Sequence, residues 1–173
     1  LKDPFSLAGQ VALITGGGTG LGLGMAKAFA AQGAKVILAG RREEVLQKAV
    51  KEIGESADYR VHDVVDFAKS GTLIESVEKQ HGSLTTLINN AGIGMTGLVH
   101  EMDFDLWRKM MAVNVDGVFL GVKHALPLMR AAGSGNIINV SSVAGIRSTA
   151  NFSCYCATKA AGKSFTKSVA LEC

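Results

Sequence analysis

Ser142, Tyr155 and Lys159 are the residues of this chain whose types and spacing favour acid–base chemistry. Tyr155 and Lys159 stand four residues apart, so on a helix their side chains would share one face and meet. An ammonium beside a phenol stabilises the phenolate, which makes Tyr155 a candidate proton donor or acceptor at neutral pH. Ser142 is a candidate to orient a substrate oxygen. Taken singly, Tyr-x-x-x-Lys is common on helices, and Ser142 is equally suited to capping the next helix.

A glycine-rich segment, Thr15-Gly-Gly-Gly-Thr-Gly-Leu-Gly22, follows the first apolar run of the chain. Gly16 permits a tight turn, and Gly20 and Gly22 let a helix N-terminus approach a pyrophosphate. Strict G-x-G-x-x-G spacing is absent, and a P-loop is excluded because no Gly-Lys-Ser/Thr follows. A glycine-rich turn without function is the alternative. The predicted phosphate-binding residues are Gly16, Gly18, Thr19, Gly20, Leu21 and Gly22.

The end of the second predicted strand indicates which dinucleotide binds. An NAD site carries an acid about 20 residues after the glycine segment, for the ribose 2′-hydroxyl. Here Gly40 is followed by Arg41 and Arg42. A small residue leaves room for a 2′-phosphate, and a guanidinium binds it in a bidentate manner. The sequence therefore predicts NADP(H) in preference to NAD(H), the alternative being two arginines that merely begin a solvated helix.

Apolar runs bounded by turn residues predict alternating strands and helices. Strands are expected at 11–14, 35–39, 59–62, 84–88 and 136–140, and helices at about 21–32, 43–53, 67–81 and 153–172. A long helical stretch begins at an N-cap, Asp103, and is expected to be interrupted near Asn114 and Pro127. This alternation is typical of an α/β, Rossmann-like, doubly wound parallel sheet in three α/β/α layers. Residues 1–173 would form a single dinucleotide-binding domain, apparently truncated after the fifth strand and its helix, which leaves that strand at an open edge.

Composition excludes several classes of function. Hydrophobic residues make up 47% and charged residues 19% of the chain, as in globular proteins. The net charge of +3 comes without a basic block, so nucleic-acid binding is not expected. No apolar run is long enough for a membrane span, and the three cysteines form no disulfide framework or zinc site. We expect a cytoplasmic protein that binds neither membrane nor metal.

Together these motifs resemble the short-chain dehydrogenase/reductase family over residues 7–173. The matching residues are Thr15-Gly-x-x-x-Gly-x-Gly22, Asn89-Asn-Ala-Gly92, Asn114, Ser142 and Tyr155-x-x-x-Lys159. The resemblance implies a catalytic tetrad of Asn114, Ser142, Tyr155 and Lys159. In it Tyr155 transfers the proton and also contacts the cofactor, and Ser142 holds the substrate oxygen. Lys159 stabilises the ionised tyrosine and binds the nicotinamide ribose. Asn114 would hold a water that links Lys159 to solvent.

The same resemblance assigns further cofactor contacts and an assembly. Asp63 and Val64 would contact the adenine, and Asn90, Ala91 and Gly92 would line the cofactor. A helix cap at Asp63 and turn chemistry at Asn90 are the alternatives from the residues alone. Family members associate as homodimers or homotetramers through helices near Trp107 and Tyr155, and they continue past this point with a substrate loop and two more strands. The chain would then be the N-terminal two-thirds of such a protein.

These observations predict an oxidoreductase that transfers hydride between NADP(H) and a small-molecule carbonyl or secondary alcohol, with Ser142 and Tyr155 contacting the substrate. A nucleotide-binding module without turnover is one alternative. An epimerase or dehydratase of the extended branch is another, but that branch requires glycine where Thr19 stands. The substrate itself is open, since the expected pocket residues are small or apolar and suit many ketones. Those residues are Ile93, Gly94, Ala144 and Ile146.

Overall fold

The structure, a computed structural model, describes residues 3–173. Its strands are β1 (Val11–Thr15), β2 (Lys35–Gly40), β3 (Ala57–Val61), β4 (Thr86–Asn89) and β5 (Asn136–Asn139). Its helices are α1 (Gly20–Ala31), α2 (Glu43–Ile53), α3 (Phe67–His81), α4 (Phe104–Met111), α5 (Gly117–Ala131) and α6 (Ser153–Leu171). A π-helical turn, η1 (Ala112–Asp116), joins α4 to α5, and a 3₁₀ turn, η2 (Val143–Gly145), follows β5. No helix among residues 3–173 has both the length and the apolar character to cross a membrane.

The five strands form one parallel sheet in the order β3-β2-β1-β4-β5. The chain winds outward from β1 in one direction as far as β3, then returns to pair β4 with the other side of β1. This is a doubly wound α/β sheet, as predicted. In such sheets ligands bind at the carboxyl ends of the strands where the winding direction changes, which here is the end of β1 and β4.

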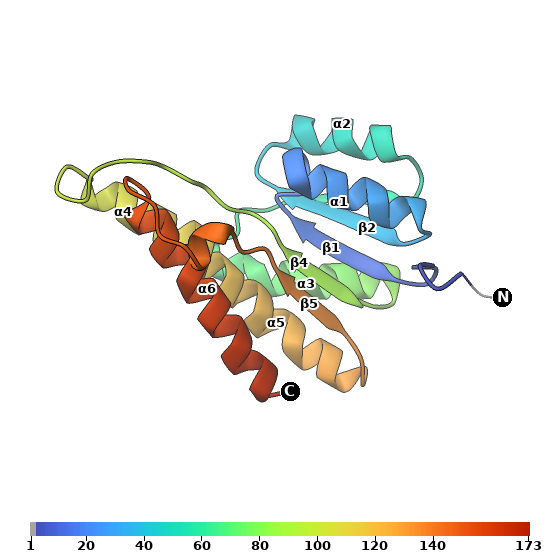
Figure 1. Cartoon of the computed structure of the whole chain (residues 1–173). Coiled ribbons are helices and arrows are strands. Elements are labelled where there is room, and N and C mark those ends of the chain that lie inside the picture. The colour runs from blue at the N-terminus through green and yellow to red at the C-terminus, as the bar shows by residue number, and fades with distance from the viewer. Residues whose placement is uncertain (1–2) are drawn as a thin grey trace.

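Helices cover both faces of the sheet, with α1 and α2 on one face and α3, α5 and α6 on the other (Figure 1). Successive residues of a strand point to opposite faces, so each strand contributes to two separate cores. Leu13 and Ile37 pack toward α3 and α5, whereas Ile14 and Leu38 pack toward α1 and α2. Burial on both faces explains why the central strands are continuously apolar.

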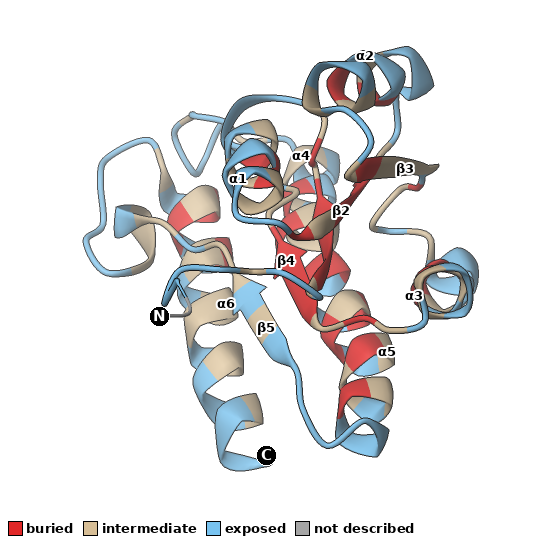
Figure 2. Ribbon diagram, turned by 90° about the vertical axis from the view of Figure 1, so that its right-hand side faces the viewer, coloured by how far each residue is buried: buried red, intermediate tan, exposed pale blue. Residues whose placement is uncertain are grey.

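β5 is an edge strand and the most exposed strand of the sheet. Within the described residues it pairs with β4 alone, and Ile138 in its middle is 44% exposed. Figure 2 shows the contrast between the buried strands β2 and β4 and the largely exposed β5. The predicted open edge is confirmed.

β3 begins two residues earlier than predicted, at Ala57 instead of Tyr59. Pairing with β2 begins at Ala57, which lies opposite Val36, and ends at Val61 opposite Gly40. His62 therefore lies just past the strand, where its backbone N–H still donates to the Gly40 carbonyl oxygen. Pairing with β2 determines where β3 begins. The local pattern of apolar residues does not reveal this pairing.

The long helical stretch is interrupted at one of the two positions predicted. The interruption at Asn114 is the π-turn η1, and the Asp103 carboxylate caps α4 by accepting from the Asp105 N–H at 2.8 Å. The prediction at Pro127 was wrong, because α5 continues through it. Pro127 is exposed and lies in the last turns of α5, while the buried Ala125 and Met129 on either side hold the helix against the sheet. One missing backbone hydrogen bond is tolerated there.

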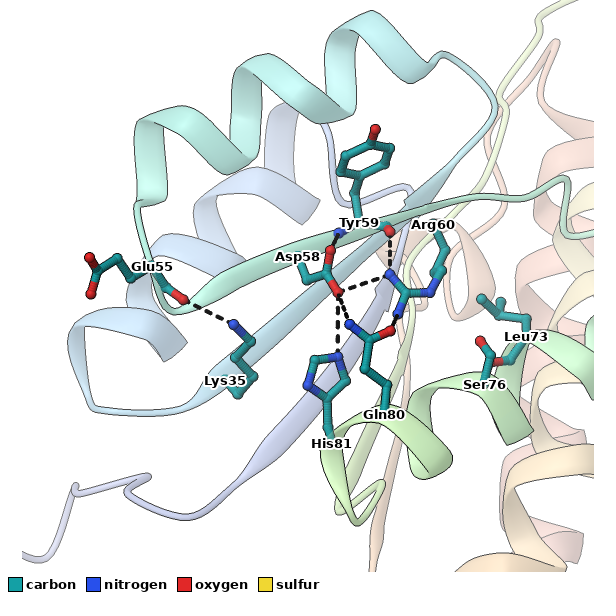
Figure 3. A network of polar contacts seen from close by, with 9 residues as sticks. All are labelled: Lys35, Glu55, Asp58, Tyr59, Arg60, Leu73, Ser76, Gln80 and His81. Atoms are coloured by element: carbon teal, nitrogen blue, oxygen red, sulfur yellow. Dashed lines mark hydrogen bonds and ion pairs between the residues drawn. The ribbon is translucent and has the colours of Figure 1, made fainter.

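A polar network anchors the outer strand β3 to the end of α3 (Figure 3). Asp58 Oδ2 accepts from Arg60 Nη1 at 2.9 Å and from Gln80 Nε2 at 3.2 Å, and His81 Nε2 lies 3.5 Å away. Burial alone would raise the pKa of Asp58, but hydrogen bonds from Arg60 and the Tyr59 backbone, with the nearby Arg60 and His81 charges, hold it below 3.8. The network lies at the amino end of the strands and leaves their carboxyl ends free for the site.

Candidate functional site

The turn from β1 into α1 brings the helix N-terminus unusually close to the sheet. Gly16 has a positive φ of 64°, which favours glycine. Gly22 is buried, and a Cβ atom placed on it would lie 2.2 Å from the Gly16 carbonyl oxygen. No side chain fits between the turn and the first turn of α1, so the helix end is held directly against the turn.

The N-terminus of α1 is open to a ligand. Thr19, at the N-cap position, makes no side-chain cap hydrogen bond, and the first turn of the helix carries no acidic residue. The first amides of a helix have no partner within the helix and lie at its positive end. Such an end binds phosphate groups.

Hydrogen bonds from β4 hold the end of β1 in place. Thr15 Oγ1 accepts from the N–H groups of Asn90 and Ala91 at 3.0 and 3.1 Å, and donates to the Ile88 carbonyl oxygen at 3.3 Å. The Asn90 side-chain amide donates to the carbonyl oxygens of Thr15 and Gly16 at 3.0 and 3.3 Å. The Asn90 amide group therefore shapes the glycine turn from behind.

A pocket of about 230 Å³ opens at the carboxyl ends of β1, β2, β3 and β4. Nine of the residues predicted to bind the cofactor line it: Gly16, Gly18, Thr19, Arg41, Arg42, Asp63, Val64, Ala91 and Gly92. Gly20, Leu21, Gly22 and Asn90 lie beside the pocket and do not form its wall. Leu21 is 75% exposed, because it is on the outer side of the first turn of α1. The predicted residues in the pocket thus come from four separate segments of the sequence and meet at one edge of the sheet.

The pocket also contains residues beyond the predicted phosphate and adenine contacts. Gly40 was predicted to leave room for a 2′-phosphate and Ile93 to line the substrate pocket, whereas five other wall residues were not predicted: Val45, Leu46, His62, Lys109 and Val113. Lys109 and Val113 are four residues apart, so they share a helix face, but no local motif indicates that this face meets the glycine turn. His62 is buried, and burial lowers its pKa, which favours the neutral imidazole.

The end of the pocket formed by Arg41 and Arg42 is positively charged. With Lys109, which also lines the pocket, these residues contribute three cations to the wall against the single carboxylate of Asp63. Arg41 Nη1 lies 4.0 Å from Asp63 Oδ2, and the Arg41 side chain is 65% exposed. This end is suited to an anionic group beyond a pyrophosphate.

The residues at the pocket fit a dinucleotide. A Cβ on Gly16 would lie 3.0 Å from Ala91 Cα, and one on Gly18 would lie 3.1 Å from the Val45 side chain. These glycines keep the pocket wall flat where it meets the open end of α1. Together with the cationic end, the arrangement provides places for a pyrophosphate and for the adenosine half of a dinucleotide.

Tyr155 and Lys159 lie on one face of α6, as their spacing predicted. Lys159 Nζ is 5.8 Å from the centre of the Tyr155 ring and donates to the Val140 carbonyl oxygen at 2.8 Å. Burial lowers the pKa of Lys159. An ammonium is thus held near the phenol in a partly dehydrated site, where its charge acts more strongly than in water.

Ser142 lies at the end of the segment that follows β5 and caps η2. Its Oγ accepts from the Ala144 N–H at 3.2 Å, so the capping interpretation of this residue is correct. The hydroxyl hydrogen is not used in that bond. Ser142 therefore keeps a donor for another oxygen.

Asn114 lies buried in the π-turn η1 and is fully engaged with the protein. Its Oδ1 accepts from the Ile93 N–H at 2.9 Å, and its Nδ2 donates to the Ile93 carbonyl oxygen at 2.8 Å and to Thr158 Oγ1 at 3.1 Å. The side chain is left without a free donor for a water. A water at this residue would have to donate to an oxygen, either the second lone pair of Oδ1 or the backbone carbonyl in the π-turn, where the regular helix ladder is broken.

Gly92 connects the pocket to these side chains. It lines the pocket, and a Cβ placed on it would lie 3.2 Å from Asn114 Oδ1 and 3.7 Å from Lys159 Nζ. A Cβ on Gly94 would lie 3.6 Å from the Tyr155 ring. The loop after β4 thus separates the pocket from the tyrosine and lysine by the thickness of one backbone segment.

Comparison with known proteins gives one family over nearly the whole chain. The family model for short chain dehydrogenases matches residues 10–173. The 2,5-dichloro-2,5-cyclohexadiene-1,4-diol dehydrogenase of Sphingobium indicum is 46% identical over 169 residues, which cover 96% of this chain and 68% of the relative. The NADP-dependent (R)-specific alcohol dehydrogenase of Lentilactobacillus kefiri is 40% identical over 170 residues, with the same coverage. The 3-alpha-(or 20-beta)-hydroxysteroid dehydrogenase of Mycobacterium tuberculosis is 37% identical over 166 residues, covering 96% and 64%.

Proposed function

The chain belongs to the short-chain dehydrogenase family, and we propose that it transfers hydride between NADP(H) and a carbonyl or secondary-alcohol substrate. The observation that carries the proposal is the position of Gly92, which borders the dinucleotide pocket and lies beside Lys159 Nζ. It brings a nucleotide site and an acid–base pair to one backbone segment. The three relatives named above are dehydrogenases of a diol, an alcohol and hydroxysteroids, which supports this class of substrate.

In the proposed reaction the nicotinamide supplies or accepts the hydride when it is bound. Tyr155 donates its hydroxyl proton to the substrate oxygen during reduction and accepts it back during oxidation. Lys159 stabilises the tyrosinate through its charge and binds the ribose beside the nicotinamide. Ser142 donates its free hydroxyl hydrogen to the same substrate oxygen. The backbone carbonyl of Asn114 holds the water through which the proton is replaced from solvent.

The pocket residues hold the rest of the cofactor in this proposal. Amides at the start of α1, with Gly16, Gly18 and Thr19, bind the pyrophosphate. Asp63 and Val64 contact the adenine, and Ala91 and Gly92 line the path toward the nicotinamide. Asn90 acts from behind by holding the glycine turn.

The proposed preference for NADP(H) depends on Gly40, Arg41 and Arg42. The three atoms nearest to a Cβ on Gly40 would belong to the Leu46 side chain, at 3.4 Å or more, so this position has room for a phosphate. Because the residue is glycine, no carboxylate occupies the position. Arg41 and Arg42 line the same end. The Lentilactobacillus kefiri relative is NADP-dependent by name, which supports the preference.

We further propose that the protein is cytoplasmic and forms a homodimer or homotetramer. Phe119 on α5 is 45% exposed and packs edge-to-face on Phe165 of α6, with ring centres 6.2 Å apart. Lys123 lies over the Phe119 ring at 5.7 Å. Exposed aromatic surface on these two helices supports an assembly through them.

The chain has two tyrosines, which provide a matched test of the proposed proton donor. In Tyr155→Phe we expect kcat for ketone reduction to fall at least about a hundredfold, since general acid catalysis contributes that much or more. The Kd for NADPH should stay within about twofold, because the hydroxyl acts on the substrate. Steady-state kinetics and NADPH fluorescence titration measure the two quantities.

Tyr59→Phe is the control, because Tyr59 does not line the pocket and its hydroxyl donates to Glu43 Oε1. It should keep the kcat of the wild-type protein. Retained turnover in Tyr155→Phe would refute the role of that residue. Tight NADPH binding by a wild-type protein that reduces no carbonyl would instead favour a nucleotide-binding module.

A further inference from the structure

Thr158 is a fully buried polar residue between Tyr155 and Lys159, and the proposed reaction gives it no role. Its relative exposure is 0%. Its Oγ1 donates to the Tyr155 carbonyl oxygen at 2.8 Å and accepts from Asn114 Nδ2 at 3.1 Å. Both the donor and an acceptor site of the hydroxyl are therefore used by protein groups.

The bond to Tyr155 alone would be unremarkable, because helical threonines commonly bond back to a carbonyl one turn earlier. The bond from Asn114 is different in kind, since it comes from another element, the π-turn η1. Asn114 also holds both backbone groups of Ile93, at 2.8 and 2.9 Å. A continuous chain of hydrogen bonds thus runs from the loop after β4, through Asn114 and Thr158, to the backbone of Tyr155.

This chain connects three parts of the site that must keep a fixed relation. The loop after β4 contains Gly92, at the dinucleotide pocket, and Gly94, beside the Tyr155 ring. Shared burial makes each bond in the chain depend on the others, because a buried amide hydrogen without an acceptor is unfavourable. Loss of the Thr158 hydroxyl would leave one Asn114 amide hydrogen unpartnered and free the loop from α6.

We propose that Thr158 is a positioning residue that holds Tyr155 and Lys159 in register with the dinucleotide-binding loop through Asn114. The effect expected on turnover rests on the proposed function. The hydrogen-bonded link between Thr158, Asn114 and the loop can be tested without a substrate. Thr158 is not among the residues that line the pocket, and its hydroxyl bonds to the Tyr155 backbone and to Asn114 rather than to the Tyr155 hydroxyl or Lys159 Nζ. It acts through Asn114 and the α6 backbone.

Thr166 on the same helix provides a matched control. Its Oγ1 donates to the Gly162 carbonyl oxygen at 2.7 Å and accepts from Asn139 Nδ2 at 2.9 Å. The bonding pattern is the same as at Thr158, two helical turns further from Tyr155. Thr166→Val therefore reproduces the loss of a hydroxyl that bridges a helix and an asparagine, without touching the proposed chain.

The first test compares the purified full-length wild-type protein with Thr158→Val, Thr158→Ser and Thr166→Val in ketone reduction. We expect Thr158→Val to lower kcat by about tenfold or more, as small displacements of positioned groups do, with the KM for NADPH changed by less than about threefold. Thr158→Ser, which keeps the hydroxyl, should restore most of kcat. Thr166→Val should keep the wild-type kcat, even where its Tm falls as far as that of Thr158→Val.

The second test measures amide hydrogen exchange at Ile93 by NMR and needs neither cofactor nor substrate. The Ile93 N–H is held by Asn114 Oδ1, so its exchange should become at least about tenfold faster in Thr158→Val and remain unchanged in Thr166→Val. Unchanged exchange at Ile93 in Thr158→Val would overturn the inference, whether or not the protein turns over. Equal losses of kcat in the two valine variants would also overturn it, while an inactive wild-type protein would count against the proposed function alone.

Discussion

At the scale of single residues, Lys159 is held in surroundings that oppose its charge. Its ammonium donates to one carbonyl oxygen, that of Val140, and burial lowers its pKa below 10.5. A lysine in such a place does not contribute to folding through its charge. Its retention beside Tyr155 is explained if the charge acts in the reaction, where a partly dehydrated ammonium stabilises a tyrosinate more strongly.

We predict that Lys159→Met abolishes turnover and that its stability relative to the wild-type protein depends on pH. Between the lowered folded-state pKa and 10.5, the unfolded wild-type chain binds more protons than the folded one, so wild-type stability rises with pH in that window. Below the window the wild-type protein bears the full unfavourable effect of burying the ammonium. The Tm of Lys159→Met minus that of the wild type should therefore be highest near neutral pH and decline toward pH 10.5.

Calorimetric scans of both proteins across this range measure the difference directly. The lost bond to Val140 adds an offset that does not vary with pH, so it does not affect the trend. A Tm difference that stayed constant, or that increased with pH, would contradict the assigned environment of Lys159.

The cofactor preference is also a residue-scale prediction. Arg41→Ala combined with Gly40→Asp should lower NADPH affinity about tenfold to a hundredfold, since charge-assisted hydrogen bonds contribute about 1.5–3 kcal/mol. NADH affinity should be unchanged or improved, because the new carboxylate can accept from a ribose 2′-hydroxyl. Fluorescence titration with both nucleotides gives the two Kd values. Lys51→Ala, which removes an exposed cation from the other end of α2, is the control. NADPH affinity unchanged by the double substitution would show that the phosphate binds elsewhere.

At the scale of elements, the contact between α1 and the turn that precedes it positions the proposed phosphate site. Gly22 allows the first turn of α1 to lie against the Gly16 carbonyl, and the Thr15–Asn90 hydrogen bonds hold that turn from the other side. A single methyl group added at Gly22 would displace the helix and move its unpaired N-terminal amides away from the pocket.

Two glycines of α1 separate this effect from ordinary helix propensity. A Cβ on Gly22 would lie 2.2 Å from a backbone oxygen, whereas one on Gly24 would meet nothing within 4 Å. We expect Gly22→Ala to destabilise the protein by about 1–3 kcal/mol, as overpacking does, and to weaken NADPH binding. Gly24→Ala should be neutral or stabilising by up to about 1 kcal/mol. Urea titration and NADPH binding check both. Equal behaviour of the two variants would mean that α1 can shift freely.

Local signals in the sequence predicted most elements but not every boundary. The bounds of α2 and α3 agree with the prediction because amphipathic spacing defines both helices locally, a glycine ends each of them, and Asp66 caps the start of α3. The start of β3 was missed because pairing with β2 extends the strand to Ala57. The uninterrupted course of α5 through Pro127 depends on burial of its neighbours, which the sequence does not show directly.

At the scale of the whole molecule, the reversal of winding between β1 and β4 assembles the site. It places Thr15 within hydrogen-bonding distance of Asn90 across a sequence separation of 75 residues. Lys109 in α4 and Val113 in η1 also line the pocket, although they are distant in sequence from the glycine turn. The motif residues were predictable because each stands in a recognisable local pattern. These additional wall residues and the Asn114–Thr158 link were not, since they depend on how distant segments meet.

The central claim is that the pocket and the Tyr155–Lys159 pair serve one reaction, and tracing the hydride tests it most directly. NADPH carrying deuterium at both positions of nicotinamide C4 is incubated with a panel of aliphatic and cyclic ketones, and the alcohols are analysed by mass spectrometry. We predict an alcohol with one deuterium on the carbinol carbon from the wild-type protein and none from Tyr155→Phe. Wild-type protein that binds NADPH yet forms no deuterated alcohol from any ketone of the panel would contradict the claim.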